Sequence, residues 1–187
     1  LGQVPPGQAL LRSGARAGDR LWVSGRLGDA RLALEVFRGT VDLTGAAFDG
    51  VRRAMELPQP RVALGLALRG LATSAIDLSD GLVGDLGHVL ARSGVGATVE
   101  VDRIPRSEVV AAHPRALQHT CVLAGGDDYE LLFTAPPAQD EAVRAAGARA
   151  GVAVTPIGRI EAEAGLRIVD ASGAPVAFAE RGFDHFA

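Results

Sequence analysis

The chain has 187 residues, of which 48% are hydrophobic and 22% charged, so it can bury a sizeable core and is not intrinsically disordered. Its formal net charge of −3 excludes the strongly basic field by which proteins recruit nucleic acid. No apolar run reaches the roughly 18 residues of a membrane span, and the single cysteine excludes an internal disulfide, so we expect a cytoplasmic protein with no membrane partner.

The first half of the chain shows one strand pattern followed by helical patterns. Residues 19–25 (DRLWVSG) alternate, which puts Leu21 and Val23 on one face of a strand and Trp22 on the other. Helical spacing then predicts three helices, at 27–39, 42–56 and 61–72. The last of these is apolar nearly all round, which indicates a buried helix.

Strand and helix patterns intermingle in the rest of the chain without a strict repeat. Strands are predicted at 73–78, 96–104, 129–134, 154–160 and 166–170, and helices at about 80–93, within 105–118 and at 138–150. This mixture predicts one layered α+β or α/β domain. Cys121 stands in an apolar run, where we expect a small buried hydrophobic side chain.

Acidic and hydroxyl side chains gather where the predicted strand at 73–78 meets the next helix. Alternation points Asp77 and Ser79 to the same side as the strand ends, and Ser79 or Asp80 is the expected N-cap of the helix. A helix N-terminus suits a phosphate, and carboxylates beside a phosphate suit Mg²⁺. An ordinary helix cap that binds no ligand explains the same residues, and the spacing leaves both interpretations open.

A second acidic stretch, GGDDYE at 125–130, follows two glycines that allow a sharp turn or a close approach to a ligand. Alternation would place Asp128 and Glu130 on one side and Asp127 and Tyr129 on the other. A Gly-Gly turn with solvated acids is the simpler alternative.

Arginine 12 and the C-terminal tail complete the set of candidates. The sequence contains no lysine, so a cation that binds phosphate must be an arginine or a metal ion. Arg12 precedes a predicted turn and strand, although an arginine in such a loop is usually a surface ion-pair partner. In the tail RGFDHF, Phe183 and Phe186 either pack the chain end onto the core or stack on a flat ligand.

Four stretches of the sequence resemble the thiamine-monophosphate kinase family, of the superfamily that includes aminoimidazole ribonucleotide synthetase and selenophosphate synthetase. They are LLRSGARAGDRLWVSGRLGDARLAL, SAIDLSDGLVGDLGHVL, GGDDYELLFT and GFDHF, in family order. The resemblance implies an α+β fold, a layered mixed β-sheet packed with helices. It also implies ATP-dependent, in-line phosphoryl transfer onto thiamine monophosphate, giving thiamine diphosphate, with several Mg²⁺ ions as cofactors.

The resemblance also implies roles for individual residues. Position by position, these are Mg²⁺ ligation by Asp77 and Asp80, ATP contacts by Arg12 and Ser79, and substrate binding by Asp127 and Phe183. Asp127 stands where the family often has Glu, so its reach to the ligand differs. Phe183 stands where the family often has Tyr or Trp, which keeps stacking but loses any polar contact of the ring.

Nothing in residues 1–187 matches the family's N-terminal domain, which carries further Mg²⁺-binding aspartates and much of the ATP site. We therefore expect the chain to be the C-terminal domain alone, with the metal- and ATP-binding N-terminal domain absent, and to be inactive by itself. The complete enzyme is expected to be a homodimer through that N-terminal domain. Two alternatives stay open: a stand-alone module that binds thiamine phosphate or nucleotide, and a sister synthetase activity of the superfamily.

Overall fold

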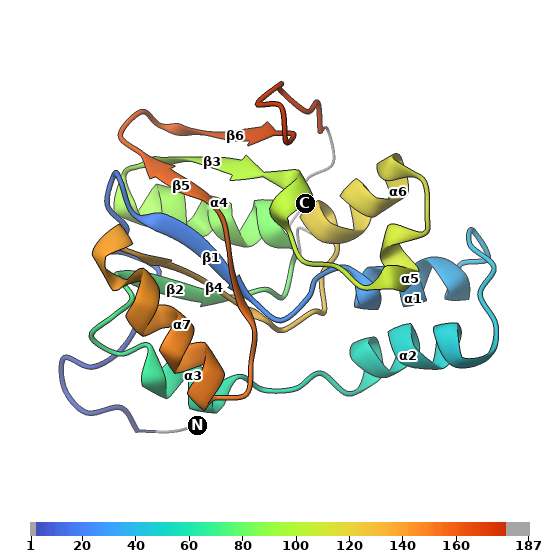
Figure 1. Cartoon of the computed structure of the whole chain (residues 1–187), viewed down its shortest axis with the longest axis horizontal. Helices are drawn as coiled ribbons and strands as arrows, with labels where there is room; N and C mark the ends of the chain where they lie inside the picture. The colour runs from blue at the N-terminus through green and yellow to red at the C-terminus, as the bar shows by residue number, and fades with distance from the viewer. Residues whose placement is uncertain (1–2, 179–187) are drawn as a thin grey trace.

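The computed structural model describes residues 3–178, and its centre is a mixed β-sheet (Figure 1). The strands are β1 (Arg20–Ser24), β2 (Ser74–Asp77), β3 (Gly96–Glu100), β4 (Leu131–Ala135), β5 (Val154–Glu161) and β6 (Gly165–Val169). They lie in the order β2-β4-β1-β5-β3-β6. The β3–β6 pair is parallel and the other neighbours are antiparallel, which confirms the predicted α+β class.

Helices pack on both faces of this sheet. They are α1 (Asp29–Phe37), α2 (Gly45–Glu56), α3 (Val62–Ala67), α4 (Leu82–Ser93), α5 (Glu108–Ala111), α6 (Arg115–His119) and α7 (Asp140–Arg149). Short turns of other helix types lie at Val101–Arg103, Thr120–Ala124 and Pro137–Gln139. Within the described part of the chain, none of these helices combines the length and the apolar character needed to cross a bilayer.

Strand β1 separates two hydrophobic cores, as its alternation predicts. Leu21 and Val23 pack into the larger core with residues of α1 and α4. Trp22 points to the opposite face, where it is fully buried and stacks on Phe133 of β4, with ring centroids 6.2 Å apart. Helices α3 and α7 cover this second core, and the guanidinium of Arg144 lies 5.1 Å from the centre of the Trp22 ring.

Helix α3 is shorter and more exposed than the sequence indicates. It spans Val62–Ala67, within the predicted 61–72. Leu64 is buried, but Val62 is 65% and Leu66 53% exposed. The expectation of a helix buried all round was wrong, because only one side of α3 rests on the sheet and nothing in the described residues covers the other.

Two smaller predictions are confirmed. Cys121 is fully buried, and burial raises the pKa of its thiol to about 12, so it behaves as a small hydrophobic side chain. In the predicted strand at 96–104, Ala97, Val99 and Val101 all face the core, although regular pairing stops at Glu100.

Candidate functional site

The two acidic stretches lie side by side where β2 ends. Beyond the regular β2–β4 pairing, the N–H of Tyr129 donates to the carbonyl of Leu78 at 2.9 Å, and the N–H of Asp127 donates to the carbonyl of Ser79 at 3.0 Å. The segment before β4 therefore continues along the segment after β2. Residues far apart in sequence are thus brought to one edge of the sheet.

The backbone of the GGDDYE segment is strained at two positions. Asp127 has φ 65° and Tyr129 has φ 49°, in the left-handed region that side chains other than glycine rarely adopt. Such conformations cost about 1–3 kcal/mol each and gather at functional sites. The Tyr129 hydroxyl lies 3.4 Å from Oδ1 of Asp127, so these two side chains meet on the exposed side of the segment.

The two glycines of this segment are required by close packing. A Cβ at Gly125 would lie 2.1 Å from the carbonyl oxygen of Cys121. A Cβ at Gly126 would lie 2.5 Å from the carbonyl oxygen of Ser79. Backbone stands in both places, so a larger residue at 126 would push the segment away from the end of β2, and one at 125 would push it away from Cys121.

The predicted cap of the helix at 80–93 is wrong. Helix α4 begins at Leu82, and its N-cap is Gly81, with φ 106° and no side-chain hydrogen bond. Asp85 organises the turn instead, since its Oδ2 accepts the backbone N–H groups of Ser79 at 3.0 Å and Asp80 at 3.1 Å. Gly81 therefore occupies the N-cap position predicted for Ser79 or Asp80, and the carboxylate of Asp85 holds this turn from within α4.

Asp85 lies under the acidic turn and not on the helix surface. It is only 2% exposed, although it stands in the first turn of α4. Burial raises the pKa of its carboxyl, and the neighbouring charges of Asp80 and Asp77 act in the same direction. The candidate metal ligands therefore have a buried carboxylate directly beneath them.

The charges of three candidate residues act on the phenol of Tyr129. The charge of Asp127, then partial burial, then the charges of Asp77 and Asp80 raise the pKa of this tyrosine. Asp77 is exposed and Asp80 half-buried, so both present carboxylates near the surface. The structure thus brings Asp77, Asp80 and Asp127 to one face of the molecule.

These carboxylates do not form a complete metal site by themselves. Among the described residues, no group of three or more His, Cys, Asp or Glu side chains is arranged to hold a metal ion. Mg²⁺ commonly takes one or two carboxylates and fills the rest of its shell with phosphate oxygens and water. Asp77 and Asp80 fit that partial donor set.

Asp77 stands between two hollows. The first, about 530 Å³, is lined by residues of the N-terminal segment, including Leu11 and Arg12, and by Arg69 and Ile76. We call it the Arg12 hollow. Because Asp77 lines it too, the structure brings a candidate ATP contact and a candidate metal ligand to the same cavity.

The second hollow, about 470 Å³, is mostly apolar, and we call it the Tyr129 hollow. Its lining residues are Pro58, Pro60, Arg61, Val62, Gly65, Asp77, Tyr129 and Leu131. The connector between α2 and α3 forms one wall and the strained segment before β4 forms another. The sequence gives no sign that the connector lines a site, because Pro58 and Pro60 indicate only the end of a helix.

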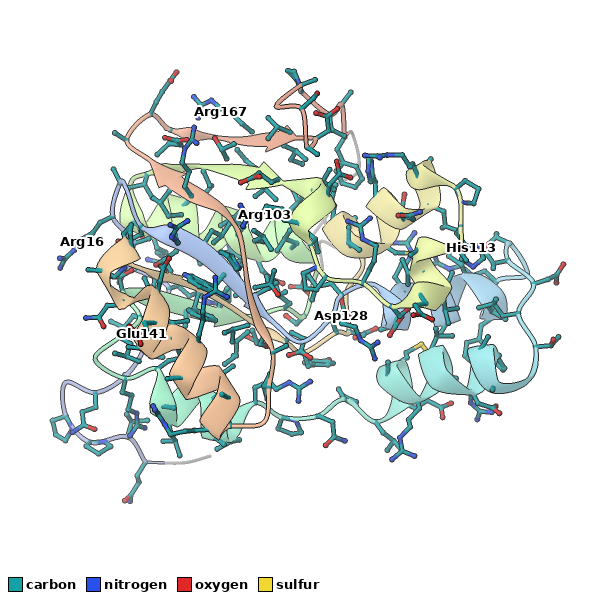
Figure 2. The ribbon with its side chains drawn as sticks, in the orientation of Figure 1. Arg16, Arg103, His113, Asp128, Glu141 and Arg167 are labelled. Carbon is teal, nitrogen blue, oxygen red and sulfur yellow. The ribbon has the colours of Figure 1, made fainter. Side chains whose placement is uncertain are left out.

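On its opposite side, the GGDDYE segment is anchored to the start of α1. Asp128 accepts the N–H of Gly28 with both carboxylate oxygens, at 3.1 and 3.0 Å (Figure 2). Enclosure by protein raises its pKa well above the usual value, the Gly28 hydrogen bond opposes this, and the charges of Asp29 and Glu130 add to it. The predicted alternation of the segment is confirmed, with Asp128 and Glu130 turned away from Asp127 and Tyr129. Phe183 lies outside the described residues.

Comparison with known proteins identifies the family of the chain. Residues 16–171 match the family model described as AIR synthase related protein, C-terminal domain. Thiamine-monophosphate kinase of Salmonella typhimurium is 42% identical over 192 residues, covering all of this chain and 58% of that protein. The chain therefore spans a little over half the length of this relative.

Two solved structures are similar in fold and sequence. The crystal structure of thiamine-monophosphate kinase from Stenotrophomonas maltophilia K279a has a TM-score of 0.84 and 42% identity, covering 89% of this chain and 55% of that one. A structure of AaThiL complexed with AMPPCP and TMP has a TM-score of 0.75 and 29% identity, covering 95% of this chain and 54% of that one.

Proposed function

Because the chain belongs to the AIR synthase related proteins, through their C-terminal domain, we propose that it is part of a thiamine-monophosphate kinase. The complete enzyme transfers the γ-phosphoryl group of ATP to the phosphate of thiamine monophosphate and forms thiamine diphosphate. The high identity to thiamine-monophosphate kinases and the similarity to AaThiL, which was solved with AMPPCP and TMP, support this reaction.

The observation that carries the proposal is the convergence of Asp77, Asp80 and Asp127 on one face. Two distant stretches of sequence pair along their backbones to create it. Asp77 and Asp80 would hold Mg²⁺, which neutralises the charge of the phosphates and of the transferred group. The protein needs no nucleophile of its own for such a transfer, since positioning and charge compensation supply most of the catalysis.

Arg12 and Ser79 are proposed as the contacts to ATP. Arg12 lines the same hollow as Asp77, and a guanidinium can bind phosphate oxygens through two parallel hydrogen bonds. Ser79 lies in the turn before α4, whose N-terminal end adds a favourable dipole for an anion.

Asp127 and Phe183 are proposed as the contacts to thiamine monophosphate. Asp127 is exposed and stands beside Tyr129, so its carboxylate is available to a ligand with cationic or amino groups. Phe183 stays a prediction from the resemblance. The remaining Mg²⁺ ligands, and the interface of a homodimeric cytoplasmic enzyme, are proposed to lie in an N-terminal domain that the relatives' greater length provides.

A phosphorylation assay tests the proposal. We expect the complete enzyme to convert thiamine monophosphate with ATP and Mg²⁺, and the 187-residue chain to do so only when the N-terminal domain is added. Robust turnover by the chain alone would contradict the division of the site between two domains. Micromolar binding without turnover, even after that addition, would favour a binding module, and activity on another substrate would favour a sister synthetase.

The same assay tests the acids. Asp77→Asn and Asp80→Asn in the complete enzyme should lower kcat at least about a hundredfold, because each removes a charge that compensates the phosphates. Their melting temperatures should stay close to that of the wild type, and Asp42→Asn, a change of another exposed aspartate, should alter neither quantity. Parallel losses of activity and melting temperature would instead assign these acids to the folding of the turn.

A further inference from the structure

Glu130 is a buried acid for which the proposed reaction gives no role. It is 5% exposed, and its carboxylate binds Arg61 through two hydrogen bonds, Nε to Oε2 at 2.7 Å and Nη2 to Oε1 at 2.5 Å. The hydroxyl of Ser24 donates to Oε2 as well and accepts the N–H of Leu131. Both carboxylate oxygens are therefore satisfied by residues of β1 and of the connector before α3.

The end of β1 is shaped to receive this carboxylate. A Cβ at Gly25 would lie 1.9 Å from Oε1 of Glu130, so only glycine allows the approach. Gly25 also has φ 59°, a conformation that favours glycine. Glycine is therefore required at position 25 for the Glu130 carboxylate to fit against the end of β1.

Glu130 is bonded to two different parts of the fold. Its side chain is fixed to β1 and to Arg61, while its carbonyl accepts the N–H of Leu78 at 2.8 Å. The strained residues Tyr129 and Asp127 come just before it in the chain. Because Glu130 is fixed through both its side chain and its backbone, it can hold Asp127 and Tyr129 in left-handed conformations that cost free energy.

Arg61 connects the same anchor to the opposite wall of the Tyr129 hollow. It follows Pro58 and Pro60 in the connector and precedes Val62, and all of these line that hollow. Arg61 also lines a separate hollow of about 320 Å³ together with Glu130, whose chain neighbours Tyr129 and Leu131 line the Tyr129 hollow. The pair therefore joins the connector wall to the Tyr129 wall.

We propose that the Arg61–Glu130 pair positions Asp127 and Tyr129 and fixes the width of the Tyr129 hollow, which receives the cationic ring of the substrate. This rests on the function proposed above. The ring assignment follows from charge: Glu130 neutralises Arg61, and Asp77 and Asp127 leave the aromatic face of Tyr129 in a negative environment. A flat cationic ring matches an aromatic face and nearby carboxylates.

The first test uses the 187-residue chain without any substrate. Hydrogen exchange measured by NMR reports the amides of Asp127 and Tyr129, which bond to Ser79 and Leu78. In Glu130→Gln we expect protection of these two amides to fall about tenfold or more relative to the amides of β1 and β5, because local opening becomes easier than global unfolding. Uniform loss of protection, or none, would overturn the positioning role.

The second test uses the complete enzyme. Glu130→Gln and Arg61→Gln should each raise the KM for thiamine monophosphate about tenfold, while the KM for ATP changes little, since a misplaced wall weakens only the ligand that it contacts. The double variant Arg61→Gln/Glu130→Gln leaves no unpaired buried charge. The change in the logarithm of its KM for thiamine monophosphate should therefore be smaller than the sum of the two single-variant changes. Equal changes in both KM values would refute the assignment to the substrate ring.

A matched control is available in α2, where Arg52 and Glu56 form an exposed pair with Nε 2.8 Å from Oε1. Arg52→Gln and Glu56→Gln should leave both tests unchanged. The two tests also separate the proposals: if the wild-type enzyme does not phosphorylate thiamine monophosphate while exchange at Asp127 and Tyr129 responds to Glu130→Gln, the proposed function fails and the positioning role stands.

Discussion

At the scale of single residues, the acids of the GGDDYE segment have the same chemistry and opposite surroundings. Asp127 is exposed beside Tyr129, whereas Asp128 binds the start of α1 and Glu130 binds Arg61. Alternation along an extended segment predicts this division from the sequence. It does not predict the partners, because Gly28 and Arg61 are remote in the chain and nothing near them in sequence marks them as hydrogen-bonding partners.

Asp128 leads to a prediction about pH. Enclosure raises its pKa in the folded state above the value of about 3.9 expected in the unfolded chain. A carboxyl group of this kind favours the folded state fully below the unfolded pKa, and this contribution is lost as the pH rises through the folded pKa. Compared with Asp128→Asn, the wild type should therefore lose free energy of unfolding as the pH is raised from about 4 upward.

Urea denaturation at a series of pH values measures this difference. The asparagine amide keeps an oxygen that can accept the N–H of Gly28, so the variant changes the titration more than the contact. Asp42→Asn should follow the wild-type curve, because Asp42 is exposed. Wild-type and Asp128→Asn curves that stay parallel from acid to neutral pH would contradict the prediction.

At the scale of elements, the start of α4 is decided by how closely it packs against another segment. Helix α6 continues into a π-helical turn, Thr120–Ala124. A Cβ at Gly81 would lie only 2.9–3.1 Å from the backbone atoms of Ala124. Gly81 also has φ 106°. Because position 81 is glycine, α4 can begin in contact with the Thr120–Ala124 turn. This contact sets the position of the acidic turn between β2 and α4.

Gly81→Ala should destabilise the protein by more than the roughly 1–2 kcal/mol of a left-handed conformation alone, because backbone must also move. Gly87, within α4, has open space around a Cβ, and Gly87→Ala should stabilise the same helix by about 0.5–1 kcal/mol. Thermal unfolding of both variants measures the contrast. Similar shifts for the two substitutions would show that packing against Ala124 is unimportant.

The elements also show where a local pattern is insufficient. The pattern at 61–72 describes an apolar helix, and the structure has a short helix with Val62 and Leu66 exposed. Periodicity reports which residues can be buried, whereas the neighbouring sheet and helices decide how much of a helix is covered. The strands are better predicted, because alternation alone assigns Leu21 and Trp22 to opposite cores.

At the scale of the whole molecule, the candidate site is an acidic face beside two hollows and not a closed metal cage. The described residues provide no preformed group of three metal-binding side chains. On our proposal, Asp77 and Asp80 need phosphate oxygens and a second domain to complete the coordination shell of the metal. Metal and nucleotide should therefore bind in a coupled manner.

Calorimetry tests this coupling on the 187-residue chain. Mg²⁺ alone should give no saturable binding in the micromolar range, because Asp77 and Asp80 supply only part of its coordination. Mg²⁺ should bind to ATP in the presence of the chain roughly tenfold more tightly than it binds to ATP alone in buffer, a difference of about 1.4 kcal/mol. Asp77→Asn should abolish that gain. A tight Mg²⁺ site in the absence of phosphate would show that the chain holds the metal without help.

By itself the sequence determined which residues alternate between the two cores, which segments form strands and helices, and which short motifs carry acids, glycines and arginine. These properties are local, since they follow from the periods of strand and helix. Tertiary structure alone decided that Asp85 and not Ser79 or Asp80 organises the start of α4, and that Glu130 pairs with Arg61 across 69 residues. The Asp85 contacts span only five and six residues, but the start of α4 depends on the close approach of Gly81 to Ala124. The Arg61–Glu130 contact depends on where the fold brings distant segments, and no local pattern records that placement.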